Sequence, residues 1–314
     1  MYEIFKMEKG LVTRTDEIQD NIWINMVRPS VDEINEISMK LDIEKSVIMT
    51  SLDDEEESRI DMETEYSMIL IDAPAIEIRN QREEYATYPL SIIIIPNAII
   101  TVSLHEFYSI NSIIENKKQT HPINIESKIN FALVILYRVS IQYQGYLKLI
   151  AKKRMAIEAS IRNKTQRSDL FELHELESNL VYFKTSLSVN LSVVERLKKQ
   201  FKFVTEPDDR DLLEEVNVEV DQALKMTTTY SEIVRGTRQL VQADINNTAT
   251  GIMKFLTSIT LVVSIPTMIS GIFGMNFDYI PGTQHPAGFL ITVLLMVVII
   301  YFSIRYLRKQ DLWR

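Results

Sequence analysis

Four consecutive residues near the C-terminus, Gly274-Met275-Asn276-Phe277, lie between two long apolar segments. The Gly274 carbonyl and the Asn276 side-chain amide offer neutral oxygen acceptors, which can hold an ion's water shell and still allow the ion to leave. The position of this tetrapeptide between two segments of membrane length favours a pore.

A second set of small or oxygen-bearing residues lies in the apolar segment just before this motif. They recur in alternating three- and four-residue steps, which places them on one stripe of a helix. The stripe consists of Met253, Thr257, Thr260, Ser264, Thr267, Gly271 and Gly274. Such residues also mediate packing between membrane helices, so the stripe alone supports self-association as readily as conduction. A plain membrane anchor is the simplest alternative, and the regular sidedness of the stripe argues against it.

Two apolar segments, Phe255 to Phe273 and Ala287 to Ile304, contain no Lys or Arg. A helix of roughly 20 apolar residues crosses about 30 Å of hydrocarbon, so each segment is long enough to span a membrane. Pro266 removes one backbone hydrogen bond from the first segment, which membrane helices tolerate where neighbours satisfy the freed carbonyl. The two segments and their polar connector predict a helical hairpin.

Basic residues flank the hairpin on one side only. Lys254 precedes the first segment, and Arg305, Arg308, Lys309 and Arg314 follow the second. The positive-inside rule therefore places both termini in the cytoplasm. The first residues lack the apolar core and cleavage site of a signal peptide, so we expect insertion to depend on the hairpin.

The residues before the hairpin, about 250 of them, are enough for one or two domains with a core. The chain has no cysteine, which excludes disulfides and thiolate metal sites, and its four histidines show no ligand spacing. No glycine occurs between Gly10 and Gly145 or between Gly145 and Gly236, so phosphate-binding glycine loops are absent from those stretches. An enzyme has the least support among the function classes.

The first 123 residues show the pattern of a mixed α/β domain. Strands are predicted at Ile22 to Met26, Tyr66 to Ile71, Leu90 to Ile95 and Ile99 to Val102. The last two flank a Pro96-Asn97 turn and read as a hairpin buried on both faces, which helices should cover. A helix is expected after Pro29, with Val31, Ile34 and Leu41 pointing inward.

Long helices are predicted from about Asn124 to Val204, where apolar residues recur at helical spacing and proline is absent. Pro207 ends this region and can occupy the first turn of the next helix. No strong breaker follows until the motif at Gly274, so one helix is expected from about Asp208 to Phe273. A helix of that length needs neighbours, which several copies around an axis would supply.

The sequence resembles the CorA family of divalent-cation channels. The resemblance rests on Met253-Lys254, Ile265-Pro266-Thr267, Ser270-Gly271-Ile272-Phe273 and the Gly-Met-Asn motif. Upstream, it extends to Trp23-Ile24-Asn25-Met26, to Leu52-Asp53-Asp54 before Arg59-Ile60, and to the strand from Tyr66 to Ile71, so it covers nearly the whole chain.

The resemblance implies an α/β cytoplasmic domain, a long helical stalk and two C-terminal transmembrane helices, assembled as a funnel-shaped homopentamer in the cell membrane. The implied parts are a cytoplasmic α/β domain at 1–123, a long-helix region packed on it at 124–205, a stalk helix at 206–252, a pore-lining transmembrane helix at 253–273, an external loop with the filter at 274–286, a second transmembrane helix at 287–304 and a basic cytoplasmic tail at 305–314.

The resemblance also implies roles for individual residues in Mg²⁺ uptake, with Co²⁺ and Ni²⁺ carried by many family members. Gly274, Met275 and Asn276 would form the selectivity filter, and Asp278 would lie at the outer mouth, whereas Gly282 stands where the family often has a second acid. Mg²⁺ keeps several of its waters, so neutral acceptors suit it. The pore would be lined by Met253, Leu256, Thr257, Thr260, Ser264, Thr267 and Gly271, with Met253 and Leu256 as an apolar gate.

In the family, intracellular Mg²⁺ bound between cytoplasmic domains holds the channel closed. Glu215 matches one carboxylate of this kind, and Asp211 and Asp208 lie one and two turns earlier. Carboxylates that converge across an interface repel one another, so a divalent cation would stabilise the closed assembly. The alternative for any one acid is an ordinary solvated surface.

Two other functions stay open. The same architecture could select Co²⁺ or Zn²⁺, or the chain could form a nonconducting, membrane-anchored oligomeric sensor. The expected partners are further copies of the chain, membrane lipid and divalent cations, with Mg²⁺ both transported and regulatory. No organic cofactor, no nucleic acid and no catalytic activity are expected, since no nucleophile-base or metal-ligand constellation occurs.

Overall fold

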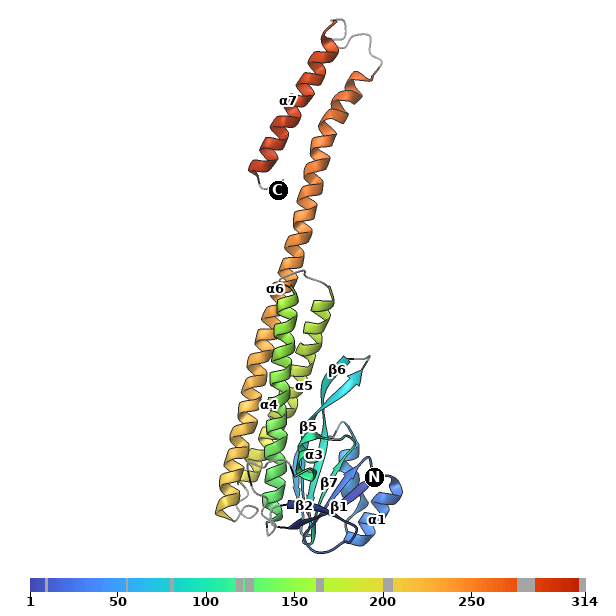
Figure 1. Ribbon diagram of the computed structural model, residues 1–314, viewed down its shortest axis with the longest axis vertical. Helices are drawn as coiled ribbons and strands as arrows, with labels where there is room; N and C mark the ends of the chain where they lie inside the picture. The colour runs from blue at the N-terminus through green and yellow to red at the C-terminus, as the bar shows by residue number, and fades with distance from the viewer. Residues whose placement is uncertain are drawn as a thin grey trace. The chain divides into compact units, whose positions relative to one another are not determined.

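The computed structural model describes residues 1–8, 11–54, 56–79, 82–116, 121, 127–161, 167–199, 206–275 and 286–310. The chain divides into two compact units, Met1–Arg238 and Gln239–Arg314. The first unit contains a sheet covered by helices, and the second contains the remainder of a long helix and one further helix (Figure 1).

A single sheet of seven strands forms in the described part of the first unit. The strands are β1 Tyr2–Glu8, β2 Leu11–Thr15, β3 Ile22–Val27, β4 Arg59–Met62, β5 Ser67–Arg79, β6 Arg82–Ile94 and β7 Ala98–Ser103. Their order is β2-β1-β3-β7-β6-β5-β4. β3 and β7 pair in parallel, whereas the other neighbours pair antiparallel.

The predicted strands are confirmed. Ile22 to Met26 lies within β3, and Tyr66 to Ile71 corresponds to the start of β5. The predicted hairpin is the β6–β7 pair, in which Ile94 lies opposite Ile99. β7 is buried at every position, as expected for a strand covered on both faces.

The helices are α1 Val31–Leu41, α2 Lys45–Met49, the short 3-10 helix η1 Thr50–Leu52, α3 Tyr108–Ile114, α4 Lys128–Ile161, α5 Arg167–Lys199, α6 Pro207–Phe273 and α7 Gly288–Lys309. α1 begins with a capping box in which Ser30 accepts from the Glu33 N–H and the Glu33 carboxylate accepts from the Ser30 N–H. Ile34 is buried and Leu41 packs against the core, but the prediction for Val31 is wrong. Val31 is the first residue of the helix and is 70% exposed.

The side chains of β3 show how the two faces of the sheet are covered. Ile24 and Met26 join the cluster that packs under α1 and α2. Trp23 points to the other face, where its ring lies 5.1 Å from that of Phe131 in α4. Its Nε1–H donates to Thr101 Oγ1 at 2.9 Å, so the buried indole has a polar partner. Helices therefore cover both faces, with α1 on one side and α4 and α5 on the other (Figure 1).

The starts of α4 and α6 are joined by a buried carboxylate. Asp209 in the first turn of α6 is 2% exposed. Its oxygens accept from Ser127 Oγ at 2.7 Å and from Asn130 Nδ2 at 2.8 Å. The Ser127 hydroxyl oxygen also accepts from the Asn130 backbone N–H at 3.1 Å, as an N-cap of α4 does. One residue of α6 therefore fixes both the cap and the first turn of α4.

The prediction of one helix from about Asp208 to Phe273 is confirmed by α6, which runs unbroken from Pro207. Proline suits the first helical position because the N–H that it lacks would have no intrahelical partner there. Asp208 and Asp209 follow in the first turn, where carboxylates interact favourably with the helix dipole. The predicted long helices before it are α4 and α5.

Candidate functional site

The predicted stripe lies on the part of α6 that belongs to the second unit, and its side chains are exposed there. All of its members are exposed: Met253, Thr257, Thr260, Ser264, Thr267, Gly271 and Gly274. α6 and α7 are each long and apolar enough to cross a membrane. Exposed small and hydroxyl-bearing residues on such a helix can line a pore or mediate packing between membrane helices.

A different face of the same helix is covered within this unit. Ser258 is 2% exposed, and the half-buried residues beside it are Ile259, Val262, Ile265, Pro266 and Ile269. Successive residues of an α-helix are about 100° apart, so this face lies opposite the stripe. The other helix of the unit is α7, in which Leu307 is buried. The stripe therefore lies on the exposed side of the helix, together with apolar residues such as Val263 and Met268.

Three of the four hydroxyls of the stripe, those of Thr260, Ser264 and Thr267, donate to the helix's own backbone. Thr260 Oγ1 donates to the Leu256 carbonyl at 2.9 Å, and Thr267 Oγ1 donates to the Val263 carbonyl at 2.8 Å. Ser264 Oγ donates to the Leu261 carbonyl at 3.0 Å. A hydroxyl has one proton and two lone pairs, so each of these oxygens can still accept a hydrogen bond from outside the helix.

Both ends of the stripe carry exposed residues of the predicted site. Met253 and Leu256 are 69% and 62% exposed and form an apolar patch at the N-terminal end. At the other end the Gly274 N–H donates to the Ser270 carbonyl at 2.9 Å, and Met275 is 51% exposed. A Cβ on Gly274 would lie 3.2 Å from the Ser270 oxygen, so a side chain there would require a small shift of the turn. Asn276 and Asp278 lie outside the described residues, as do Gly282 and Arg314.

The three acids predicted to bind regulatory Mg²⁺ lie on the exposed side of the first turns of α6. Asp208 and Asp211 are exposed, and Glu215 is half-buried. Glu215 Oε2 lies 3.2 Å from His121 Nε2. Within the described ranges, no three His, Asp or Glu side chains converge in an arrangement that could hold a metal ion.

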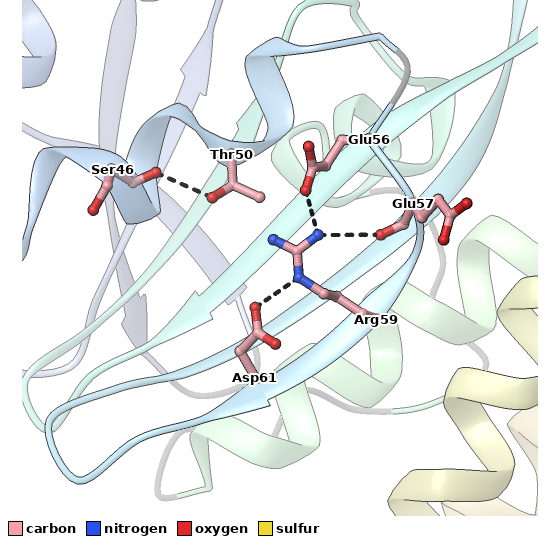
Figure 2. Close-up of polar contacts among 6 residues, drawn as sticks. All are labelled: Ser46, Thr50, Glu56, Glu57, Arg59 and Asp61. Atoms are coloured by element: carbon pink, nitrogen blue, oxygen red, sulfur yellow. Dashed lines mark hydrogen bonds and ion pairs between the residues drawn. The ribbon is translucent and has the colours of Figure 1, made fainter.

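The acidic run at residues 53–57 is partly neutralised by one arginine (Figure 2). The Arg59 guanidinium pairs with Glu56 and donates to Asp61 Oδ2 at 2.8 Å and to the Glu57 carbonyl at 3.5 Å. The hydrogen bond to Glu56 raises the pKa of Arg59. Asp54 Oδ1 lies 4.0 Å from His105 Nε2, and burial lowers the pKa of that histidine.

Two features of the site were missed by the sequence reasoning. Asp209 is one of six acids between residues 206 and 215, and nothing in the local sequence marks it as the one that turns inward to Ser127 and Asn130. The second feature is the pairing of the stripe's threonine hydroxyls with backbone carbonyls four residues earlier. Such pairing is common for Thr in helices, so the sequence could have predicted it.

The comparisons with known proteins agree with this arrangement. The family model described as CorA-like Mg²⁺ transporter protein matches residues 19–309. The cobalt/magnesium transport protein CorA of Methanocaldococcus jannaschii is 30% identical over 293 residues, which is 92% of this chain and 90% of that protein. The magnesium transport protein CorA of Wolinella succinogenes is 23% identical over 330 residues, covering 99% of both chains.

The solved structures show the same likeness. The complete structure of the CorA magnesium transporter from M. jannaschii superposes with a TM-score of 0.84 at 26% identity, and it covers 98% of both chains. The full-length CmaX protein has the same fold, with a TM-score of 0.67 at 16% identity over 98% of this chain and 97% of that one. A match over nearly the whole sequence, with two membrane-length helices at its C-terminal end, shows that this chain belongs to the CorA family of membrane transport proteins.

Proposed function

We propose that this chain forms a homopentameric channel that admits Mg²⁺ through the cell membrane into the cytoplasm. The proposal is supported by relatives described as magnesium or cobalt/magnesium transport proteins. In it, the stripe of α6 lines the pore and α7 lies on the lipid side. Gly274, Met275 and Asn276 form the filter, and Asp278 attracts cations at the outer mouth.

The acceptor character of the stripe is the observation that carries this proposal. Because the hydroxyl protons of Thr260, Ser264 and Thr267 are committed to backbone carbonyls, the groups turned outward are lone pairs. Mg²⁺ sheds its water reluctantly, and the hydrogens of its bound waters point away from the ion. A row of neutral acceptors can receive those hydrogens without holding the ion as strongly as carboxylates would.

The apolar end of the stripe supplies a gate in this proposal. Met253 and Leu256 are exposed on the protomer and offer no hydrogen bonds to water. A ring of such side chains in a narrow pore favours a dry, nonconducting state. Glu215, with Asp208 and Asp211, would bind intracellular Mg²⁺ and stabilise the closed assembly; for Glu215 this requires separation from His121.

The domain boundaries and the membrane sidedness form part of the same proposal. We assign 1–123 and 124–205 to the cytoplasmic α/β domain and its packed helices, 206–252 to the stalk and 305–314 to a cytoplasmic tail. The chain has no cysteine, so single-cysteine variants at Glu3 and Gln310 can be labelled without background. Protection of both from a membrane-impermeant reagent in intact cells, and labelling after lysis, is the expected result.

The central test is Mg²⁺ influx into proteoliposomes loaded with a Mg²⁺-sensitive dye. Asn276→Ala should abolish influx while the assembly persists. Thr260→Val removes one acceptor from the stripe at constant shape and should slow influx by up to about tenfold, which corresponds to about 1.4 kcal/mol of barrier. Thr292→Val is the matched control, because the Thr292 hydroxyl makes the same backbone bond on α7, at 3.0 Å to the Gly288 carbonyl.

The alternatives give different outcomes in the same assay. Inhibition of Mg²⁺ influx by Co²⁺ or Zn²⁺ at concentrations far below that of Mg²⁺ would indicate selection of another divalent cation. No influx at low internal Mg²⁺ would favour a nonconducting sensor, in which Thr260→Val changes assembly alone. Unchanged Mg²⁺ sensitivity of Glu215→Gln would remove that residue from the regulatory site.

A further inference from the structure

A cavity of about 530 Å³ opens on the first unit between α3 and α4, and none of the residues assigned to ion transport above lines it. Its one link to them is the lining residue His121, which lies 3.2 Å from Glu215. Pockets of about 300–1,000 Å³ commonly hold small molecules. The lining combines three tyrosines, Tyr108, Tyr137 and Tyr146, with the aliphatic Leu149 and a single arginine, Arg138. The Arg138 guanidinium therefore shares the cavity lining with three aromatic rings.

The Arg138 guanidinium is half-buried, and burial lowers its pKa, although guanidinium stays charged in proteins. Its Nη1 donates to Ser112 Oγ at 2.6 Å. In the part of the chain that the structure describes, no carboxylate forms an ion pair with it. A half-buried guanidinium without an anionic partner keeps free N–H donors, which an oxyanion or water can accept.

A second polar group at this cavity lacks a partner. Ser109 lines the cavity and is 1% exposed, and its Oγ makes no hydrogen bond within the described structure. Buried hydroxyls are paired in most native structures. Ser109 Oγ and Arg138 together offer an O–H and several N–H donors at the same site, which matches the acceptor oxygens of a carboxylate or phosphate.

The cavity is also kept open by a glycine in the interior of α4. Gly145 lines it, and a Cβ built on Gly145 would meet no atom within 4 Å. Glycine in a helix interior makes the helix less stable than alanine would. At position 145 of α4, a side chain larger than alanine would fill the cavity.

We propose that this cavity binds a small molecule with an aromatic body and one carboxylate or phosphate group, the oxyanion at Arg138 and Ser109 and the ring between the tyrosines. Aromatic rings stack favourably against tyrosine side chains, and guanidinium pairs with such oxyanions through two parallel hydrogen bonds. The site is independent of the proposed ion transport, since it uses neither the stripe nor the filter.

The test uses the full chain in detergent micelles without divalent cations, with phenyl phosphate and benzoate as probes. Saturation-transfer NMR detects ring contact, and calorimetry gives the dissociation constant. We expect saturable binding to the wild type. Arg138→Gln should weaken it at least about tenfold, the effect of losing a charge-assisted pair. Lys148→Gln, which removes a charge from an exposed position on the same helix, should leave it unchanged.

Gly145 gives a second, steric test that leaves Arg138 in place. Gly145→Leu should fill the cavity and abolish binding, whereas Gly145→Ala should retain it. Absence of probe binding to the wild type, or equal binding to Gly145→Leu, would overturn the proposal. A short-chain phosphatidic acid and inorganic phosphate are the last two probes. If either binds more tightly than phenyl phosphate, the ligand is not aromatic and that assignment is overturned.

Discussion

Replacement of Asp209 by alanine tests whether one buried carboxylate joins the starts of α4 and α6. The wild-type side chain is 2% exposed and accepts hydrogen bonds from Ser127 and Asn130. A hydrogen bond to a charged group contributes roughly 1.5–3 kcal/mol, so the loss of both at the low end destabilises the fold by about 3 kcal/mol. The lower end applies because Ser127 also accepts from the Asn130 N–H and keeps that bond.

The assay is thermal unfolding of the full chain in detergent, followed by intrinsic fluorescence. For a domain of this size, each kcal/mol shifts Tm by about 2–4 °C, so Asp209→Ala should lower Tm by about 6–12 °C. Asp208→Ala is the matched control, because Asp208 is exposed in the same helical turn. Its Tm should change by less than about 2 °C.

A double-mutant cycle separates the contribution of the Asp209–Asn130 hydrogen bond from the other effects of removing each side chain. If Asp209 and Asn130 act through their shared hydrogen bond, the Tm loss of Asp209→Ala combined with Asn130→Ala should be smaller than the sum of the single losses. Equal Tm values for Asp209→Ala and Asp208→Ala, or strict additivity in the cycle, would refute the reasoning.

Three further variants test the fold. Gly145→Ala should raise Tm by about 2–4 °C, because alanine stabilises a helix interior by about 1 kcal/mol and meets no atom there; a lower Tm would contradict the open space. Trp23→Phe removes the hydrogen bond to Thr101 and leaves a gap, so Tm should fall by about 4–8 °C for a loss of about 2 kcal/mol, and an unchanged value would contradict it. Burial raises the pKa of the Asp72 carboxyl, so the folded chain binds the carboxyl proton more tightly than the unfolded chain does. The protonated carboxyl therefore stabilises the fold at low pH, and this stabilisation is lost as pH rises through the raised pKa. Asp72→Asn should therefore flatten the fall of Tm over that window, and an equally steep fall in the variant would exclude Asp72.

The features that the sequence predicts well are those with a local and repeated signal. The length of α6 follows from helical spacing after Pro207 that is interrupted only by single glycines and by Pro266, which a membrane helix tolerates. α7 follows from hydropathy alone. The β6–β7 hairpin follows from two isoleucine-rich runs around a Pro-Asn turn. In each case the determining residues lie within a few turns or strands of one another.

The sheet order and the edge strands depend on contacts that no local pattern encodes. β3 pairs in parallel with β7, although about seventy residues separate them, because the α/β crossover returns the chain to the neighbouring position. β1 and β2 were not predicted. β2 is a short edge strand in which a single residue, Val12, is buried, so its alternation is too weak to recognise.

The candidate site divides in the same way. The stripe was predicted from its spacing, and its role in lining a pore stays a prediction. The direction of the hydroxyl protons is a property of helix geometry, and the inward turn of Asp209 is a property of tertiary packing. Sequence spacing gives the face of a helix on which a residue lies, but not the hydrogen-bond partners of its polar atoms.

The proton direction also bears on the sign of the ion. If the stripe lines the pore, an anion passing Thr260, Ser264 and Thr267 would need hydrogen-bond donors, and these hydroxyls already donate to the helix backbone. A hydrated cation needs acceptors, which the same hydroxyls retain. The stripe can therefore favour cations over anions without any carboxylate, and the weak, neutral contacts that result are those from which Mg²⁺ with its water shell can depart.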